Sequence, residues 1–84
     1  MIVPMTEISQ KVEALRQGTT LPPVRARRAI REAAGIGQGE LAAVLDVSRF
    51  SLWRWETGKA EPQGDVRRRY AGALRALQGI GSDA

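Results

Sequence analysis

Apolar residues along most of this chain recur three or four positions apart, the period of an α-helix with one buried face. The pattern is clearest near the C-terminus, where one stripe contains Val66, Tyr70, Ala73, Leu74 and Leu77. No stretch alternates apolar and polar residues as a half-exposed strand does. The pattern therefore predicts an all-α protein. We expect a compact bundle of about five short helices, with a central pair joined by a tight turn.

Helix-ending and helix-starting residues divide this pattern into five segments, at about residues 6–17, 24–34, 38–45, 49–57 and 65–78. Four predicted ends carry a glycine, which readily adopts the left-handed conformation found there: Gly18, Gly35, Gly58 and Gly79. Ser48 has the side chain of a helix N-cap, and Asp46 before it tolerates a positive φ. Glu40 can reach back to the amide of Gly37 as one half of a capping box.

The segment Gly-Thr-Thr-Leu-Pro-Pro at residues 18–23 divides the chain, because two consecutive prolines cannot continue a helix. We expect three parts. Residues 1–23 form an N-terminal helix and connector that serves packing or dimerisation. Residues 24–78 form the main domain, and residues 79–84 form a flexible tail.

The spacing also predicts which side chains of the central helices face the core. For residues 24–34 we expect the packing face to consist of Ala26, Ala29, Ile30 and Ala33. The polar face should consist of Arg25, Arg27, Arg28 and Arg31. For residues 38–45 the inward residues should be Leu41, Ala42, Val44 and Leu45. In the next helix Leu52 and Trp55 should be buried, and the outward residues should be Arg49, Phe50, Trp53 and Arg54.

Composition narrows the possible functions. The chain has no cysteine and no histidine, so disulfides and thiolate metal sites are excluded and the commonest general base is missing. The acidic residues form no paired constellation, so we expect no enzyme, no metal and no cofactor. The net charge of +4 favours a polyanionic partner. No apolar run approaches the roughly 20 residues of a membrane span. We therefore expect a cytoplasmic protein without membrane contact.

Several blocks at fixed intervals carry a family resemblance: Arg28 and Arg31, AAGIGQGELA at 33–42, VS at 47–48 and WETGKAEP at 55–62. With these blocks, residues 24–77 resemble the lambda-repressor-like helix-turn-helix family of the xenobiotic-response-element type. The resemblance implies a DNA-binding fold in which the segment 49–57 is the recognition helix. It also implies a buried structural pair of Arg31 with Glu56.

The resemblance and the chemistry of the side chains together predict the contacts with DNA. The residues expected to read bases are Ser48, Arg49, Phe50, Trp53 and Arg54. Those expected at the DNA backbone are Gln38, Arg28, Ser51 and Lys59. The resemblance implies that Gln38 either contacts a phosphate or supports the recognition helix. Arginine matches the O6 and N7 atoms of guanine, and phenylalanine can contact the methyl group of thymine. Phe50 and Trp53 depart from the polar residues usual in the family, so these rings could instead contact sugar or pack on another protein surface.

Three functions are compatible with these features. The first is a sequence-specific regulator, expected to be a repressor that binds an inverted repeat of double-stranded DNA as a homodimer through the major groove. The second is an antitoxin that represses its own operon and binds a toxin through residues 1–20. The third is a helical protein-interaction adaptor, which the exposed rings of Phe50 and Trp53 would favour.

Overall fold

The computed structural model describes residues 20–81, and these residues form four helices without a strand. The helices are α2 (Val24–Ala33), α3 (Gln38–Leu45), α4 (Arg49–Thr57) and α5 (Gly64–Gly81). The all-α prediction is confirmed. The predicted first helix at residues 6–17 lies outside the described residues.

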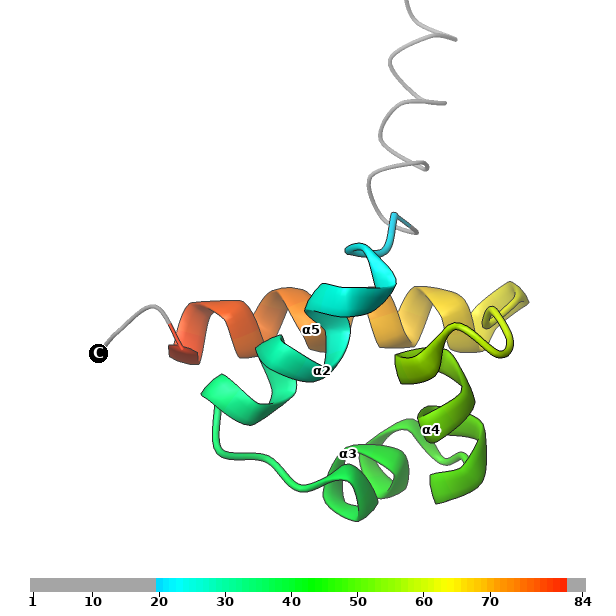
Figure 1. Cartoon of the computed structure of the whole chain (residues 1–84), viewed down its shortest axis with the longest axis horizontal. Coiled ribbons are helices and arrows are strands. Elements are labelled where there is room, and N and C mark those ends of the chain that lie inside the picture. Colours follow the sequence, from blue (N-terminus) through cyan, green and yellow to red (C-terminus); the bar gives the residue numbers. More distant parts are fainter. Residues whose placement is uncertain (1–19, 82–84) are drawn as a thin grey trace, which may run out of the picture.

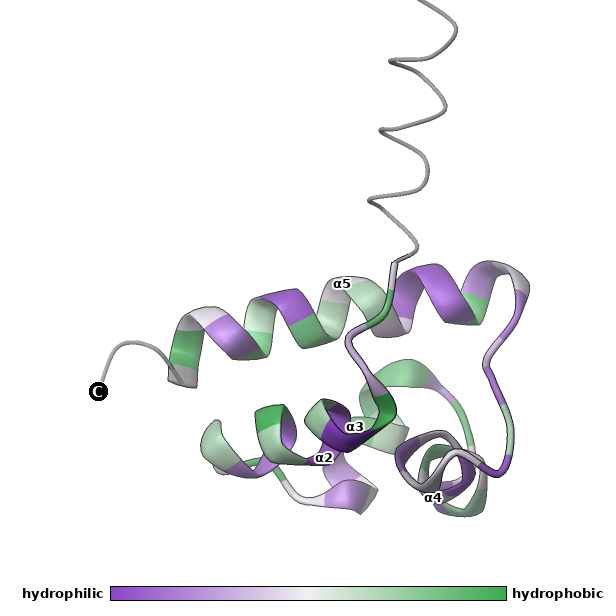
Figure 2. Cartoon of the chain, turned by 45° about the horizontal axis from the view of Figure 1, so that its top comes forward, coloured by the Kyte–Doolittle hydropathy of each residue, from purple (hydrophilic) through white to green (hydrophobic). Residues whose placement is uncertain are grey.

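Helix α5 is the longest helix of the described residues, and α2 crosses in front of it in Figure 1. Figure 2 shows α2, α3 and α4 together on one side of α5. Helix α2 contacts both α5 and α4, while α3 contacts α4 and α5. In Figure 2 hydrophobic and hydrophilic bands alternate along α5, as in an amphipathic helix with one buried face. None of the helices within residues 20–81 is both long and apolar enough to cross a membrane.

Local signals set most of the helix ends. Asp46 adopts the left-handed conformation, with φ of 57°, directly after α3, and Gly58 does so after α4, with φ of 76°. Ser48 caps α4, since its Oγ accepts a hydrogen bond of 3.0 Å from the amide of Ser51. The amide of Gly37 donates to Glu40 Oε1 over 3.2 Å, which is the expected half of a capping box.

The C-terminal helix is longer than predicted. The expected end at Gly79 is wrong, because α5 continues to Gly81. A glycine inside a helix costs only about 1 kcal/mol relative to alanine, so it ends a helix only when other signals agree.

The core lies between α5 and the two central helices. Its buried apolar side chains are Leu41, Ala42, Leu45, Leu52, Trp55, Tyr70, Ala71, Leu74 and Leu77. The rings of Trp55 and Tyr70 pack with centroids 5.2 Å apart. Burial raises the pKa of Tyr70, so its hydroxyl stays protonated. The burial of Leu52 and Trp55 is as predicted.

One side chain of α3 contradicts the predicted core. Val44 is 75% exposed, although it was expected to face inward. The buried residues of α3 cluster around Leu45, and Val44 precedes Leu45 by one residue. It therefore lies about 100° around the helix axis from that centre.

The predicted packing face of α2 is correct only in part: Ala26 is half-buried and Ile30 packs against the core. Ala29 and Ala33 are exposed, whereas Arg27 and Arg31 are buried, with 5% and 7% of their surface accessible. Buried guanidinium groups need partners for their donors. Arg27 donates to the carbonyls of Pro22 and Trp55 over 2.9 and 3.2 Å.

A carboxylate completes the surroundings of Arg27. Its Nη1 lies 2.9 Å from Glu61 Oε1, which joins α2 to the loop that follows α4. The hydrogen bond from Arg27 holds the pKa of Glu61 below its usual value. Arg67 of α5 reaches the same carboxylate, over 3.3 Å to Oε2. The loop between α4 and α5 is thus held from both sides by arginines.

Arg31 forms a two-pronged ion pair with Glu56 of α4. Its Nε and Nη2 donate to the two oxygens of Glu56 over 2.6 and 3.0 Å, and Nη1 donates to the carbonyl of Ile36 over 2.9 Å. The Glu56 side chain is only 1% exposed. This hydrogen bonding raises the pKa of Arg31, which stays charged.

The three consecutive arginines of α5 have different neighbours. Arg69 donates to the carbonyl of Leu45 over 3.1 Å and so satisfies the end of α3. Its Nη1 also lies 2.6 Å from Asp65. Arg68 lies 3.6 Å from Asp65 on the exposed side, and Arg67 faces Glu61. As the sequence indicated, these arginines do not all face one surface.

Substitution of Arg31 by alanine should lower the free energy of unfolding by about 3–5 kcal/mol, because Glu56 would be left as an unpaired buried charge. Arg28 on the same helix is the matched control. Its guanidinium is exposed and pairs only with Glu32, so Arg28→Ala should cost less than about 0.5 kcal/mol. Urea unfolding at neutral pH measures both. Equal losses in the two variants would show that the buried pair does not stabilise the fold.

The lowered pKa of Glu61 makes stability dependent on pH. A carboxylate whose pKa is lower in the folded state stabilises the fold above its unfolded pKa, near 4.5, and this contribution is lost as the pH falls through the folded pKa. Glu61→Gln should therefore reduce the loss of stability between pH 6 and pH 3. The change should be at most about 1 kcal/mol, because the side chain is 44% exposed. An unaltered pH profile in urea unfolding would contradict this prediction.

Candidate nucleic-acid interface

Helix α4 has a buried side and an exposed side. Leu52, Trp55 and Glu56 are buried and fix the helix against the rest of the fold. The outward side carries the four side chains expected there, and all are exposed: Arg49, Phe50, Trp53 and Arg54. Ser48 lies exposed at the N-terminal end of the same helix. The outward side therefore presents two arginines and two aromatic rings to a partner.

A chain of hydrogen bonds connects the buried ion pair to this exposed surface. Gln38 Nε2 donates to Glu56 Oε1 over 3.1 Å, and Arg49 Nε donates to Gln38 Oε1 over 3.3 Å. Glu56 is itself held by Arg31. We call this series, Arg31–Glu56–Gln38–Arg49, the polar relay. It restricts the guanidinium of Arg49 through Nε and leaves its terminal nitrogens for another partner.

Gln38 is brought next to Arg49 by the helix-turn-helix geometry, since it opens α3 and Arg49 opens α4. Its amide has a positioning role in this arrangement. The family resemblance allowed Gln38 to support the recognition helix, but nothing in the sequence indicated Glu56 as its partner. The two residues are 18 positions apart, and no local pattern connects them.

The two aromatic side chains of α4 contact each other. The ring centroids of Phe50 and Trp53 are 5.8 Å apart with an angle of 19° between the planes, so the rings are stacked. Arg54 Cζ lies 5.7 Å from the centroid of the Phe50 ring, within the range of a cation–π interaction. We refer to Phe50 and Trp53 as the ring pair.

The two serines at the start of α4 are occupied with each other. Ser48 Oγ accepts from the amide of Ser51 and donates to Ser51 Oγ, both over 3.0 Å. Ser48, predicted to read bases, thus serves as a helix cap in this structure. The hydroxyl hydrogen of Ser51 remains available to an acceptor.

Two further basic residues expected at the DNA backbone lie on other segments. Lys59 is exposed in the loop after α4, and its amide donates to the carbonyl of Arg54 over 2.9 Å. Arg28 lies on the exposed side of α2, paired with Glu32. Lys59 is thereby tied to α4, whereas Arg28 is paired within its own helix.

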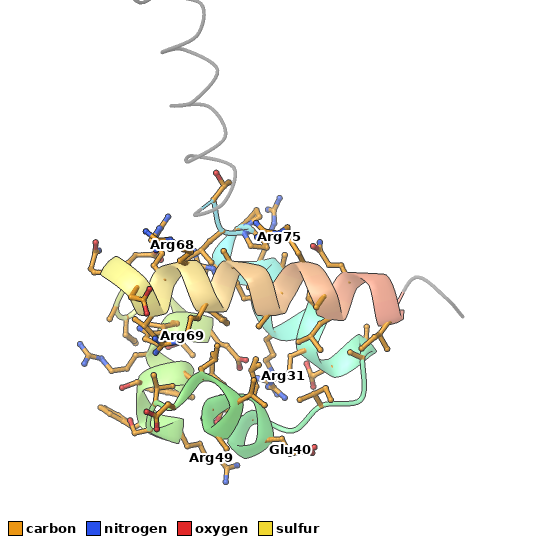
Figure 3. The ribbon with its side chains drawn as sticks, turned by 180° about the vertical axis from the view of Figure 1, so that it is seen from behind. Arg31, Glu40, Arg49, Arg68, Arg69 and Arg75 are labelled. Atoms are coloured by element: carbon orange, nitrogen blue, oxygen red, sulfur yellow. The ribbon has the colours of Figure 1, made fainter. Side chains whose placement is uncertain are left out.

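Charged side chains occur on opposite sides of the molecule. Figure 3 shows Arg49 and Glu40 at one side, whereas Arg68 and Arg75 of α5 project from the other. A single nucleic-acid surface that contacts Arg49 therefore cannot also contact Arg75. Within residues 20–81, Arg49 on α4 and the pair Arg68 and Arg75 on α5 thus belong to two separate surfaces.

Removal of the Gln38 amide should release the side chain of Arg49. We expect Gln38→Ala to lower the ¹⁵N heteronuclear NOE of Arg49 Nε, because the bond over 3.3 Å to Gln38 is lost. The Nε of Arg31, which keeps both bonds to Glu56, is the internal control and should be unchanged. Unchanged values at Arg49 would show that the polar relay does not order this side chain.

Comparison with known proteins identifies the fold. A family model described as a helix-turn-helix domain matches residues 24–79. No curated protein and no solved structure matches the chain significantly. The matched residues include α3, the turn at Asp46 and α4, which are the two helices and the turn that give the domain its name. This chain belongs to the helix-turn-helix domain family of DNA-binding regulators.

Proposed function

We propose that this protein is a sequence-specific regulator of transcription that inserts α4 into the major groove of double-stranded DNA. The observation that carries the proposal is the position of Arg49. It is an exposed arginine at the N-terminal end of α4, held by the polar relay. An α-helix fits the major groove, and the residues of its N-terminal part contact base edges.

The outward side of α4 supplies the base contacts in this proposal. Arg49 and Arg54 each present a guanidinium that matches O6 and N7 of guanine. Arg49, Phe50, Trp53 and Arg54 are spaced i, i+1, i+4 and i+5, which places them on one side of a helix. Ser48 lies at the end that enters the groove, where its backbone and hydroxyl approach the DNA.

Residues around α4 supply the phosphate contacts. Lys59 follows the helix directly and offers a cation, and the hydroxyl of Ser51 offers a hydrogen-bond donor. Arg28 adds a phosphate contact from α2 if it leaves Glu32. Gln38 holds Arg49 and Glu56, so we assign it positioning of the base reader in addition to any contact with the backbone.

We further propose that the protein acts as a homodimer on an inverted repeat and represses transcription by occluding a promoter. One small module buries only about 600–1,000 Å² of protein surface on DNA, and a pair of modules provides the specificity that a genome requires. Residues of α5 or of the segment 1–23 would form the dimer. The cytoplasm is the corresponding location.

One observation favours a second function. Phe50 and Trp53 are exposed to 64% and 41%, and exposed large apolar side chains mark sites of protein interaction. A helical adaptor would use this patch for a protein. An antitoxin would instead bind a toxin through residues 1–20 and retain DNA binding, and an adjacent toxin gene would distinguish it from a simple repressor.

Binding to random duplex DNA separates the regulator from the adaptor. Fluorescence anisotropy at several salt concentrations should show affinity that falls steeply with salt, with a log–log slope near −0.9 for each phosphate neutralised. Selection of bound sites from a random duplex library should then return an inverted repeat. Lack of binding at low salt would overturn the proposed function.

The role of Arg49 gives a sharper test. Arg49→Ala should weaken binding to the selected operator by about 1–3 kcal/mol and relax the preference at one base position. Arg75→Ala is the matched control, since it removes the same charge from the opposite side of the molecule (Figure 3). It should leave the base preferences unchanged. A uniform loss across all sequences in Arg49→Ala would instead assign Arg49 to a phosphate.

A further inference from the structure

The ring pair is an exposed apolar surface that the fold does not need. Phe50 is 64% and Trp53 is 41% exposed, and neither belongs to the hydrophobic core. Both project from α4 beside Arg49 and Arg54. The two rings are therefore expected to contribute to binding of a partner by α4 and not to the stability of the fold.

The two rings are ordered by contacts within α4 before any partner binds. They stack with centroids 5.8 Å apart, and the guanidinium of Arg54 lies 5.7 Å from the Phe50 centroid. Aromatic side chains have only two rotatable torsions, so mutual stacking leaves little freedom to lose on binding. A surface that is ordered before binding loses less conformational entropy on binding, so the same contacts give a higher affinity.

The major groove offers one kind of apolar group to such a surface. Base edges there carry donors and acceptors, and the C5-methyl group of thymine is the apolar exception among the four bases. 5-Methylcytosine carries the same group at the same ring position. A face of polar side chains alone would leave this methyl group without an apolar partner.

We propose that the ring pair reads the C5-methyl group of a pyrimidine, while Arg54 reads a guanine close to it. This inference rests on the proposed insertion of α4 into the major groove. Successive bases are about 3.4 Å apart, so the 5.7 Å between Arg54 and the Phe50 ring is comparable with one to two base steps. The ring pair and Arg54 together thus recognise a methylated pyrimidine and a neighbouring guanine as one unit.

The charges around the ring pair favour DNA over a protein as the occupant. Arg49 directly precedes Phe50 in the sequence, and Arg54 directly follows Trp53. Positive groups beside an apolar patch complement a methyl group set between phosphate strands. A protein partner for the same patch is an outcome of the test below.

The test compares operators that differ only in methyl groups. After selection of the operator, each thymine is replaced in turn by deoxyuridine, which removes only the C5-methyl group. Binding of the full chain should weaken about fourfold at each contacted position, the value for one buried methyl-sized group. In a second series, each cytosine is replaced by 5-methylcytosine, and about a fourfold gain would identify that base as the source of the methyl group.

Variants of the ring pair connect the effect to these side chains. Phe50→Ser and Trp53→Ser should bind the thymine and deoxyuridine operators with equal affinity. Their thermal midpoints should match that of the wild type, since neither ring is part of the core. Ile80→Ser is the control, because Ile80 is 58% exposed in the last turn of α5. The C-terminal end of α5 lies away from α4 (Figure 1). It should keep the preference for the methyl group.

The possible failures are distinguishable. If the wild type prefers its operator to random DNA but ignores every methyl change, this inference is overturned and the proposed function stands. If Phe50→Ser and Trp53→Ser bind the thymine operator as tightly as the wild type, the rings do not touch DNA. This inference is then overturned, and the ring pair is assigned to a protein partner instead. If no duplex is bound at low salt, the proposed function fails together with this inference.

Discussion

The ion pair between Arg31 and Glu56 fixes α2 against α4, the helix that carries the candidate interface. It joins α2 to α4 through two hydrogen bonds of 2.6 and 3.0 Å, almost completely away from solvent. Arg27 adds a second link between the same helices through the carbonyl of Trp55. The buried side of α2 is therefore held by directional polar bonds, which fix its angle and register on α4 more narrowly than alanine packing would.

The two sides of α4 contribute differently to the fold. Leu52 and Trp55 join a small core, and a domain of this size has only a few kcal/mol of net stability to lose. The ring pair and both outward arginines contribute nothing to that core. Their exposure is tolerated because the buried side, the Ser48 cap and the loop held by Arg27 already fix the helix. The outward residues can accordingly change without loss of the fold.

The sequence predicted what local signals control. The ends of α3 and α4, the left-handed Asp46 and the cap at Ser48 depend on residues within a few positions. Helical spacing placed Arg27 on the polar face of α2, and this was wrong, because its burial depends on Glu61, 34 positions away. The burial of Arg31 against Glu56, 25 positions away, was expected only from the family resemblance and not from the spacing. The outward residues of the candidate site followed from helical spacing and the family resemblance. The coupling of Arg49 to Glu56 through Gln38 could not be predicted in the same way, because it joins two helices and helical spacing relates residues of one helix only.

The polar relay has a consequence for genetics. A genetic screen for loss of regulation records only the phenotype, so it does not distinguish a residue that contacts DNA from a residue that supports it. Glu56, with a side chain only 1% exposed, would be recovered alongside Arg49 although it lies too deep to meet a nucleotide. The set of residues defined by such a screen is thus larger than the footprint on DNA, and it extends inward along the relay to α2. Residues of the polar relay that lie inside the fold must therefore be excluded before DNA contacts are assigned from mutant phenotypes.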